Sequence, residues 1–458
     1  MAFDLSRRRA VHIVGVGGPG MSAVALVLAE MGHRVTGSDL KETSYLERVR
    51  VAGVRVMIGH APENLDGAEV VVVSTAIPAG NLEVRVAEER GIPVVHRSAM
   101  LAAIVGRTRG IGVAGTHGKT TTTSMLSLIL DEAGWNPSFI VGGQLHNVGT
   151  GARWTGAEWL VVEADESDGT FLQLPLAASI CTNIDVDHLD YFGSVAGIEA
   201  GFARYLDQVD GPLVVCADEP VVARLGAERG AITYGTSPAA DYRIESLVVE
   251  QGAQRFELWH HLDRLGEISL PLRGIHMARN AAGAAAMALT LGAPVTAVQE
   301  ALARFGGVAR RFDFRGEERG ITLVDDYAHL PAEIAAVMEA AAHGGDNWRR
   351  VVAVFQPNRY SRMEILSPDY ADSFVNADVT VVMDVYPSGE LPLPGVTGKL
   401  VVNAVLDAHP DAQVLYLPRR SEAAAVLAQY LRPGDVCISM GCGDVATLPD
   451  EILAVWAR

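Results

Sequence analysis

The stretch Ala114–Ser124 reads AGTHGKTTTTS and decides the fold of the chain. It follows the apolar run Ile111–Ala114 and precedes a helical stretch, so it predicts a strand, a glycine loop and a helix in that order. Successive backbone N–H groups in such a loop cradle phosphate oxygens, a lysine neutralises the β- and γ-phosphates, and the next hydroxyl reaches magnesium. The stretch therefore predicts a phosphate-binding loop in an α/β domain.

Lys119 and Thr120 are the lysine and the hydroxyl of this loop. The strict pattern GxxxxGK[ST] would require glycine at Val113, so the match is to a shortened loop, GxxGKT, that begins at Gly115. Lys119 is one of only three lysines in a chain that otherwise prefers arginine, and a compact point charge suits a phosphate. These features favour ATP binding over a structural turn. The residues predicted to bind ATP here are Gly115, Thr116, His117, Gly118, Lys119, Thr120 and Thr121.

Outward from the loop, short β-branched runs alternate with amphipathic helical stretches, which is typical of parallel sheets with crossover helices. The predicted fold class is α/β with three domains. We expect a Rossmann-like domain over 1–106, a P-loop-type central domain over 107–305 and a second Rossmann-like α/β domain over 306–458. The pattern becomes rich in strands and turns between Tyr234 and Leu272, which predicts an antiparallel annex on the central domain.

Composition and charge exclude several classes of protein. The apolar fraction of 49% and charged fraction of 20% are typical of a globular protein, and the formal charge of −18 argues against nucleic acid or an anionic membrane surface as a partner. No apolar stretch approaches the ~18 residues that a membrane-spanning helix needs. The four cysteines form no CxxC pair, so we expect neither a disulfide framework nor a zinc site. A cytoplasmic enzyme acting on small molecules, as a monomer or homodimer, is the expectation.

Two acidic segments follow strands of the central block: EADESD, Glu163–Asp168, and TNIDVDHLD, Thr182–Asp190. Parallel strands deliver such residues to the carboxyl edge of the sheet, where the phosphate loop also lies. Magnesium usually takes one or two carboxylates together with phosphates and waters, so a carboxylate beside Thr120 is expected. The alternative is that most of these acids are helix N-caps and solvated loop residues.

A second glycine loop, GVGGPGMS, spans Gly15–Ser22 between a predicted strand and helix. Its glycines allow a backbone to approach phosphates at a helix N-terminus, and Asp39 follows Gly20 by 19 residues, close to where a dinucleotide-binding fold keeps its ribose-reading acid. Alone this signal is weak, because it also suits a nicotinamide-dependent dehydrogenase or a turn without a ligand.

These motifs, together with DDYAHLP at Asp325–Pro331, FQPNRYSR at Phe355–Arg362 and MGCGD at Met440–Asp444, resemble the Mur ligases of peptidoglycan synthesis, in order and over nearly the whole chain. The resemblance implies that the N-terminal domain holds a UDP sugar, the central domain ATP and the C-terminal domain an amino acid. It also implies a reaction. ATP would phosphorylate the lactyl carboxylate of UDP-N-acetylmuramate, and the amino group of L-alanine would displace phosphate.

The resemblance implies catalytic and metal-binding roles for particular residues. Lys119 and Thr120 with Mg²⁺ would hold the γ-phosphate, Glu163 would bind metal, and His188 would help hold a second metal. Many relatives have a carbamylated lysine after the DH motif, but this chain has no lysine between Lys119 and Lys399. The catalytic residues implied are thus Lys119, Glu163 and His188, and the metal ligands are Thr120, Glu163 and His188.

The remaining nucleotide contacts are implied in the same way. In the segment GIHMARN, residues 274–280, the resemblance implies that Asn280 contacts the adenine. It implies no such role for Met277, which replaces the first asparagine of the family pattern. Arg311 and Asp326 would reach the phosphate and ribose of ATP, with an ordinary ion pair as the alternative. The residues implied to bind the UDP sugar are Gly17, Gly18, Gly20, Met21, Ser22, Asp39, His60, Ser74 and Thr75.

The amino-acid site is implied at the carboxyl ends of two C-terminal strands. Arg359 and Arg362 would clamp the carboxylate, because a guanidinium holds it in a planar, bidentate way that lysine cannot; the alternative is two solvated arginines at a helix start. The implied set is Tyr327, His329, Asn358, Arg359 and Arg362. Asn358 and Leu330 replace histidines common in the family, which leaves alanine, glycine and serine open as the amino acid. A sister ligase that joins a recycled peptide to the same sugar, and a nucleotide-binding regulator without enzymatic activity, are the other interpretations.

Overall fold

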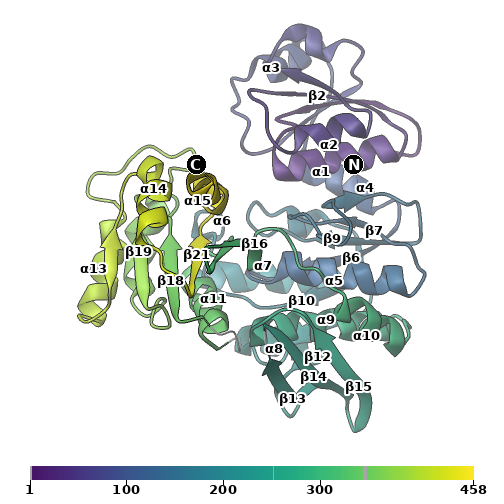
Figure 1. Ribbon diagram of the computed structural model, residues 1–458. Helices are drawn as coiled ribbons and strands as arrows, with labels where there is room; N and C mark the ends of the chain where they lie inside the picture. Colours follow the sequence, from purple (N-terminus) through teal and green to yellow (C-terminus); the bar gives the residue numbers. More distant parts are fainter. Residues whose placement is uncertain (1–2, 251, 344–347, 458) are drawn as a thin grey trace. The chain divides into compact units, whose positions relative to one another are not determined.

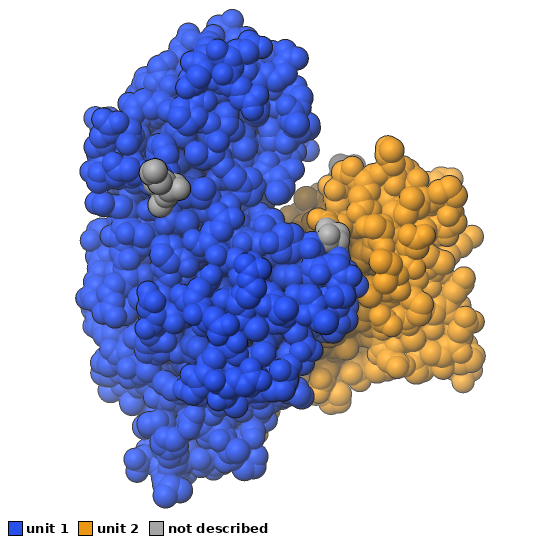
Figure 2. Space-filling view, turned by 180° about the vertical axis from the view of Figure 1, so that it is seen from behind, with its two compact units in different colours: residues 1–246, 256–269, 279–306 blue, residues 247–255, 270–278, 307–458 orange. Residues whose placement is uncertain are grey.

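The structure is a computed structural model that describes residues 3–250, 252–343 and 348–457. Within these residues the strands form three sheets, of five, ten and six strands, with helices packed against them (Figure 1). The predicted three-domain α/β fold class is confirmed, whereas the domain boundaries near residues 106 and 305 stay predictions. By compactness the chain divides into two units, shown in Figure 2: residues 1–246, 256–269 and 279–306, and residues 247–255, 270–278 and 307–458.

The N-terminal sheet is wholly parallel, with strand order β3-β2-β1-β4-β5. Helices α1 and α4 pack on one face and α3 on the other, so β1 is buried along its whole length. The strand order reverses direction beside β1, and a ligand of an open α/β sheet binds at such a point. The bounds are β1 Ala10–Val14, α1 Pro19–Glu30, β2 Arg34–Asp39, α2 Leu46–Val51, β3 Arg55–Ile58, β4 Val70–Val73, α3 Leu82–Glu89, β5 Val94–His96 and α4 Arg97–Val105.

The central sheet has the order β15-β14-β13-β12-β11-β10-β6-β9-β7-β8. The strand before the phosphate loop, β6, lies between β9 and β10 and runs parallel to both. Consequently the residues that follow these three strands meet at one edge of the sheet. The bounds are β6 Arg109–Ala114, α5 Lys119–Glu132, β7 Ser138–Ile140, β8 Ala152–Arg153, β9 Trp159–Glu163, β10 Leu176–Cys181, α6 Leu189–Phe192, α7 Val195–Asp207, β11 Leu213–Cys216, α8 Pro220–Ala227, β12 Ile232–Gly235, α9 Ile275–Thr290 and α10 Val295–Ala303.

The predicted annex is present as three strands at one end of this sheet, β13 Tyr242–Glu250, β14 Ala253–His260 and β15 Asp263–Leu270. Strands β14 and β15 are neighbours joined by only His261 and Leu262, a connection that fits antiparallel strands alone. The annex therefore extends a parallel sheet with hairpin-connected strands, as the turn-rich sequence predicts.

The C-terminal sheet has the order β16-β17-β21-β18-β19-β20 and is parallel except for β16, which pairs antiparallel with β17. Helices α11 and α13 pack on one face and α14 and α15 on the other. The sheet is thus covered on both faces, which explains its continuous apolar strands. The bounds are β16 Asp313–Glu318, β17 Ile321–Asp326, α11 Pro331–His343, β18 Arg350–Phe355, α12 Tyr360–Leu366, β19 Val379–Val382, α13 Lys399–Ala408, β20 Val414–Tyr416, α14 Arg420–Tyr430, β21 Asp435–Met440 and α15 Leu448–Trp456.

No helix among the described residues is long and apolar enough to cross a membrane.

Candidate active site

The phosphate loop turns from β6 into α5 through two glycines with positive φ, Gly115 at 130° and Gly118 at 82°. Neither position leaves room for a side chain. A Cβ would lie 2.1 Å from Thr182 Oγ1 at Gly115 and 2.5 Å from Asn280 Oδ1 at Gly118. The glycines are therefore required by both backbone conformation and close packing, and the second packs against the predicted adenine residue Asn280.

The residues after β10 hold the loop from one side. Asn183 accepts the backbone N–H of His117 at 2.8 Å and donates its amide to the His117 carbonyl at 2.9 Å. Thr182 Oγ1 donates to the same carbonyl at 2.6 Å, and the N–H of Thr116 donates to the Asn183 carbonyl at 3.2 Å. His117 Nε2 lies 3.3 Å from Asp185 Oδ2. The TNIDVDHLD segment thus shapes the phosphate loop directly.

Lys119 begins α5 and uses all three of its N–H groups inside the protein. Its Nζ lies 2.6 Å from the Gly115 carbonyl, 3.2 Å from the Thr116 carbonyl and 2.8 Å from Glu166 Oε1. Burial works to lower the pKa of Lys119, but Glu166 and Asp165 nearby raise it above its usual value, so the ammonium stays charged.

Glu166 is almost fully buried and depends on Lys119 for its ionised form. Burial raises the pKa of its carboxyl to about 7, although Lys119 acts to lower it. One oxygen accepts from Lys119, while Oε2 is buried without a hydrogen-bond partner. The ion pair therefore holds a positive charge ready at the loop, at the cost of an incompletely satisfied carboxylate.

Thr120 and Glu163, two of the predicted metal ligands, lie together. Thr120 Oγ1 donates to Glu163 at 3.0 Å, and the backbone N–H of Gly142 donates to the other oxygen of that carboxylate at 2.6 Å. A hydroxyl beside a carboxylate is an oxygen donor set that suits Mg²⁺. Within the described residues no group of three or more His, Cys, Asp or Glu side chains could hold a metal, so phosphate oxygens and waters would have to complete the shell.

The third predicted metal ligand, His188, stands at the start of α6 in a left-handed conformation with φ of 52°. Its Nε2 lies 3.3 Å from Asp187 Oδ2. A non-glycine residue held in this conformation carries backbone strain of a kind that clusters at functional sites.

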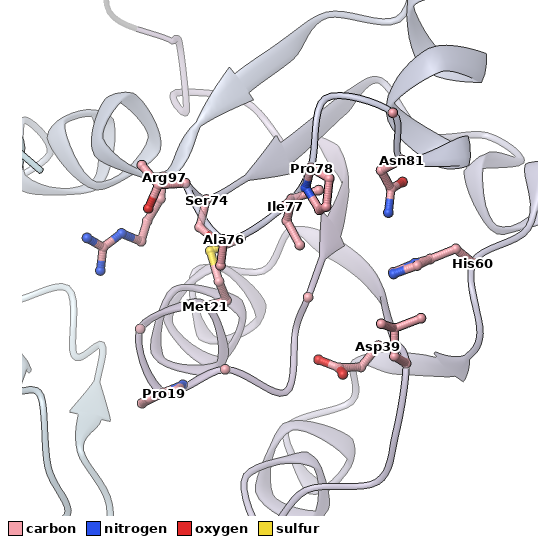
Figure 3. Close-up of a pocket in the computed structure, with 16 residues that line it drawn as sticks. Pro19, Met21, Asp39, His60, Ser74, Ala76, Ile77, Pro78, Asn81 and Arg97 are labelled. Carbon is pink, nitrogen blue, oxygen red and sulfur yellow. The ribbon is translucent and has the colours of Figure 1, made fainter. Parts of the chain in front are cut away.

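The N-terminal sheet carries a cavity of about 730 Å³ at the carboxyl end of its strands, shown in Figure 3. Glycines of the loop after β1 and the N-terminus of α1 form one wall, which suits a pyrophosphate. Of the predicted sugar-binding residues, those that line the cavity are Gly18, Gly20, Met21, Asp39, His60, Ser74 and Thr75.

The two other predicted residues, Gly17 and Ser22, support the cavity wall. Gly17 N–H donates to Asp39 Oδ2 at 2.8 Å, and Ser22 Oγ donates to the Pro19 carbonyl at 2.9 Å. Asp39 thereby buttresses the glycine loop as well as lining the cavity.

Arg97 lines the same cavity and was missed by the sequence reasoning. Its guanidinium lies 2.9 Å from Asp168 and 3.5 Å from Asp165, in the segment that also supplies Glu166 to Lys119. The EADESD segment therefore contacts both the wall of the cavity and the phosphate loop. Arg97 and its two partners lie about 70 positions apart in the sequence, so no local pattern predicts the pairing. The EADESD motif was the only sequence signal near it.

In the C-terminal sheet, Asp326 ends β17 and is 4% exposed. Its two oxygens accept the backbone N–H groups of Phe312 at 2.6 Å and Ala328 at 2.7 Å. Arg311 lies over the Tyr327 ring, with its guanidinium carbon 5.2 Å from the ring centre. In this structure Asp326 orders the backbone around Arg311 and Tyr327.

His329 packs edge-on against Tyr327, with ring centres 5.4 Å apart. Its Nδ1 lies 3.1 Å from Glu333 Oε2. Burial works to lower the pKa of His329, but Glu333 and Cys442 raise it to about 10, so the imidazole is cationic at neutral pH. Glu333 and Cys442 are site neighbours that the sequence reasoning did not single out.

Arg359, Arg362 and Asn358 follow β18, which is separated from β17 only by β21. Arg362 donates to Asn358 Oδ1 at 2.9 Å. Arg359 has φ of 60° and donates its N–H to the Tyr386 carbonyl at 2.9 Å. The predicted amino-acid residues therefore share the carboxyl edge of one sheet.

Comparison with known proteins gives a consistent result. Three family models match in order: "Mur ligase family, catalytic domain" over residues 10–109, "Mur ligase middle domain" over 113–288 and "Mur ligase, glutamate ligase domain" over 310–443. A UDP-N-acetylmuramate–L-alanine ligase of Pelotomaculum thermopropionicum is 42% identical over 98% of this chain and 98% of its own.

Two solved structures share the fold. The crystal structure of a UDP-N-acetylmuramate–alanine ligase from Thermotoga maritima matches with a TM-score of 0.85 and 26% identity, covering 98% of this chain and 99% of its own. A murein peptide ligase from Psychrobacter arcticus matches with a TM-score of 0.72 and 24% identity, covering 98% and 99%. At that identity the second likeness shows the fold alone.

Proposed function

Because this chain belongs to the Mur ligase family, we propose that it is an ATP-dependent ligase that joins L-alanine to the lactyl carboxylate of UDP-N-acetylmuramate. The products are ADP, phosphate and the amide, and the reaction is a step of peptidoglycan precursor synthesis. The observation that carries the proposal is the EADESD segment: Asp168 pairs with Arg97 of the N-terminal cavity and Glu166 pairs with Lys119 of the phosphate loop. One short segment thus contacts both the cavity that we assign to the UDP sugar and the loop that we assign to ATP.

The chemistry requires activation of a carboxylate. A free carboxylate is a poor acylating agent, whereas an acyl phosphate has a good leaving group. The carboxylate attacks the γ-phosphorus of ATP and ADP leaves; the alanine amine then attacks the acyl carbon, and the tetrahedral intermediate expels phosphate. Charge on the transferring oxygens rises along this path, so positioned cations and N–H groups supply most of the catalysis.

On the ATP side we assign the loop Gly115–Thr121 to the phosphates, with Lys119 moving from Glu166 to the β- and γ-oxygens. Asn280 lies against Gly118 and is assigned to the adenine, and Arg311 and Asp326 to the phosphate and ribose. Thr120 and Glu163, and in a second site His188, would hold Mg²⁺, which supplies neutralising charge to phosphate oxygens when bound. Thr120 Oγ1 and the Glu163 carboxylate already face each other, which supports the first of these sites.

On the acceptor side we assign Tyr327, His329, Asn358, Arg359 and Arg362 to the amino acid. The arginines would clamp its carboxylate, and the cationic His329 adds positive charge at the same edge. We further propose that the enzyme acts in the cytoplasm as a monomer or homodimer, where ATP and the UDP sugar are supplied.

The test is phosphate release by the full chain with ATP, Mg²⁺ and UDP-N-acetylmuramate across L-alanine, glycine, L-serine and a murein tripeptide. Release that depends on the sugar and is fastest with L-alanine supports the proposal. Release fastest with the tripeptide would assign the chain to the sister ligase. ATP binding without phosphate release would indicate a nucleotide-binding regulator. A change in nicotinamide absorbance without phosphate release would support the dehydrogenase alternative.

A further inference from the structure

Cys442 lies at the carboxyl edge of the C-terminal sheet, in the loop that follows β21. Strand β21 pairs in parallel with β17, and the N–H of Gly441 donates to the Asp326 carbonyl at 3.3 Å. The residues that follow the two strands therefore meet. The thiol of Cys442 makes hydrogen bonds with the side chains of Tyr327 and His329.

Two glycines fix the position of this thiol. A Cβ at Gly441 would lie 2.7 Å from the Gln356 carbonyl oxygen, and a Cβ at Gly443 would lie 2.6 Å from Gln356 Oε1. The Gln356 amide in turn donates to Asp444 Oδ1 at 2.8 Å. The loop is thus closely packed on both sides of Cys442, which holds the thiol against its two neighbours.

The His329 ring is also held in place. Its Nδ1 lies 3.1 Å from Glu333 Oε2 and 3.1 Å from the Tyr327 carbonyl, and the His329 carbonyl accepts from Tyr370 Oη at 2.6 Å. A ring nitrogen that faces two oxygens carries a proton, and the carboxylate favours the cationic ring. Cys442, His329 and Glu333 therefore stand in the order of nucleophile, imidazole and orienting carboxylate.

The charge around the thiol favours its ionised form. Burial acts to raise the pKa of Cys442, but the charge of His329, its hydrogen bond and the charge of Arg362 lower it below its usual value. The Glu333 carboxylate opposes this effect. The groups that act on the thiol come from three elements: Tyr327 and His329 follow β17, Glu333 lies on α11 and Arg362 on α12.

The other three cysteines of the chain have the opposite surroundings. Cys181, Cys216 and Cys437 are buried, whereas Cys442 is partly exposed. Burial raises the pKa of Cys216 to about 11 and that of Cys437 to about 12. An accessible thiolate reacts with electrophiles and a buried neutral thiol does not, so the chain contains its own internal controls.

We propose that Cys442 is a modification site, a thiolate held by His329 and Glu333 that peroxide oxidises reversibly to a sulfenic acid. The sulfur attacks one peroxide oxygen and the O–O bond breaks. The sulfur loses two electrons and gains the S–OH group, and the leaving hydroxide takes the ring proton of His329 and departs as water. A small-molecule dithiol reverses the step: it becomes a disulfide, the sulfenic oxygen leaves as water, and Cys442 regains its thiol.

Oxidation at this position bears on the proposed reaction. The sulfenic oxygen would stand beside Tyr327 and His329, two of the residues that we assign to the amino acid, and the thiolate charge beside the His329 cation would be gone. We therefore expect oxidation to stop use of L-alanine without affecting ATP binding. This effect on turnover rests on the proposed function, whereas the modification itself does not.

The first test treats the full chain with hydrogen peroxide and dimedone, which traps sulfenic acids, and maps the label by peptide mass spectrometry. Label is expected on Cys442 and not on the three buried cysteines. His329→Gln removes the cation, so label on Cys442 at pH 7 should fall roughly tenfold or more. His343→Gln makes the same substitution at an exposed position of α11 and should keep the wild-type labelling.

The second test measures the rate at which iodoacetamide alkylates Cys442 between pH 7 and pH 9. An ordinary thiol, with a pKa of about 8.5, gains roughly 25-fold in thiolate over this range. A thiolate already stabilised by His329 should change by less than about threefold. This profile decides the question if His329→Gln does not fold by circular dichroism, because it uses the wild-type protein.

The third test measures L-alanine-dependent phosphate release after peroxide treatment. The wild-type protein should lose turnover roughly tenfold or more, and dithiothreitol should restore it, while ATP binding by calorimetry stays unchanged. Cys442→Ala, whatever its untreated rate, should keep that rate after peroxide.

The outcomes separate the inference from the proposed function. An unlabelled Cys442, equal labelling in His329→Gln, or a 25-fold rise in the alkylation rate with pH would overturn the modification site. Equal loss of turnover in Cys442→Ala would overturn its effect on ligation. A wild-type protein that is labelled on Cys442 but releases no phosphate with any acceptor would instead overturn the proposed function.

Discussion

At the scale of single residues, Lys119 connects the phosphate loop to the acidic segment Glu163–Asp168. Its role was predicted from the sequence because the loop is contiguous. Its partner was not, because Glu166 follows the neighbouring strand β9 and is one of several acids in its segment. Arg97 was missed for the same reason, because an arginine directly after a strand has no local signature.

Replacing Lys119 should stop catalysis. Lys119→Ala removes the cation that meets the γ-phosphate, so phosphate release should fall roughly 10³-fold or more. It also leaves Glu166 buried without its cation, and the pKa of that carboxyl should rise above the value of about 7 found with Lys119 present. A folded-state pKa above the unfolded value of about 4.5 costs stability as pH rises between the two. The variant should therefore melt lower at pH 8 than at pH 6.

The double variant Lys119→Ala/Glu166→Gln is the control for that effect. It removes the titrating group, so the difference in melting temperature between pH 6 and pH 8 should shrink while turnover stays lost. Turnover near wild type in Lys119→Ala would contradict the assignment of the loop to ATP.

The metal assignment concerns Thr120 and Glu163. Glu163→Gln keeps the shape of the side chain and removes its charge, so the Mg²⁺ concentration for half-maximal phosphate release should rise on the order of tenfold or more. The same titration on His188→Ala reports on the second site. An unchanged Mg²⁺ requirement in both variants would show that Glu163 and His188 have structural roles and do not bind the metal.

The amino-acid assignment concerns Arg359 and Arg362. Lysine keeps the charge but cannot hold a carboxylate in a bidentate way, so Arg359→Lys and Arg362→Lys should raise the KM for L-alanine roughly tenfold with the KM for ATP unchanged. Alanine kinetics like those of the wild type in both variants would move the amino-acid site elsewhere.

At the scale of elements, the buried parallel strands were predicted because each is a continuous apolar run between turn residues. The structure confirms the strand predicted from the apolar run Ile111–Ala114: it is β6, and it begins two residues earlier, at Arg109. The strands β7, β8, β16 and β20 were not anticipated. The last three lie at sheet edges and are only partly buried, so an apolar pattern does not mark them, whereas β7 is buried but only three residues long.

The turn from β6 into α5 gives a prediction at this scale. Gly118→Ala would force a side chain into a left-handed conformation and against Asn280. The turn must shift, so ATP affinity should fall at least tenfold, measured by calorimetry, with the affinity for UDP unchanged. Gly134→Ala is a matched control at a positive-φ glycine where an added Cβ would meet nothing within 4 Å, and it should keep ATP affinity. Equal ATP binding in both variants would contradict the assignment of the loop.

At the scale of the whole molecule, three domains were predicted because the alternation of strands and helices falls into three blocks along the sequence. The grouping into two compact units was not predicted. It depends on which surfaces pack together, and packing between distant segments leaves no periodic trace in a sequence.

The two units should respond differently to ligands. The N-terminal cavity lies wholly in residues 1–246, so UDP-N-acetylmuramate at about 100 times its Kd should stabilise that unit by about 2.7 kcal/mol. In scanning calorimetry we expect one transition to move up by about 5 °C and a second to stay in place. L-alanine alone, which carries no nucleotide, should not move the first. A single transition that shifts as a whole would contradict independent unfolding of the units.

The arrangement around Lys119 bears on what happens after turnover. Its three N–H groups are already occupied by two carbonyls and Glu166, so an anion gains them only by breaking those bonds. ATP brings a nucleoside and further phosphates to offset that cost, whereas free inorganic phosphate brings neither. Released phosphate should therefore be a weak product inhibitor, and the loop can close on itself between cycles while phosphate is abundant around it.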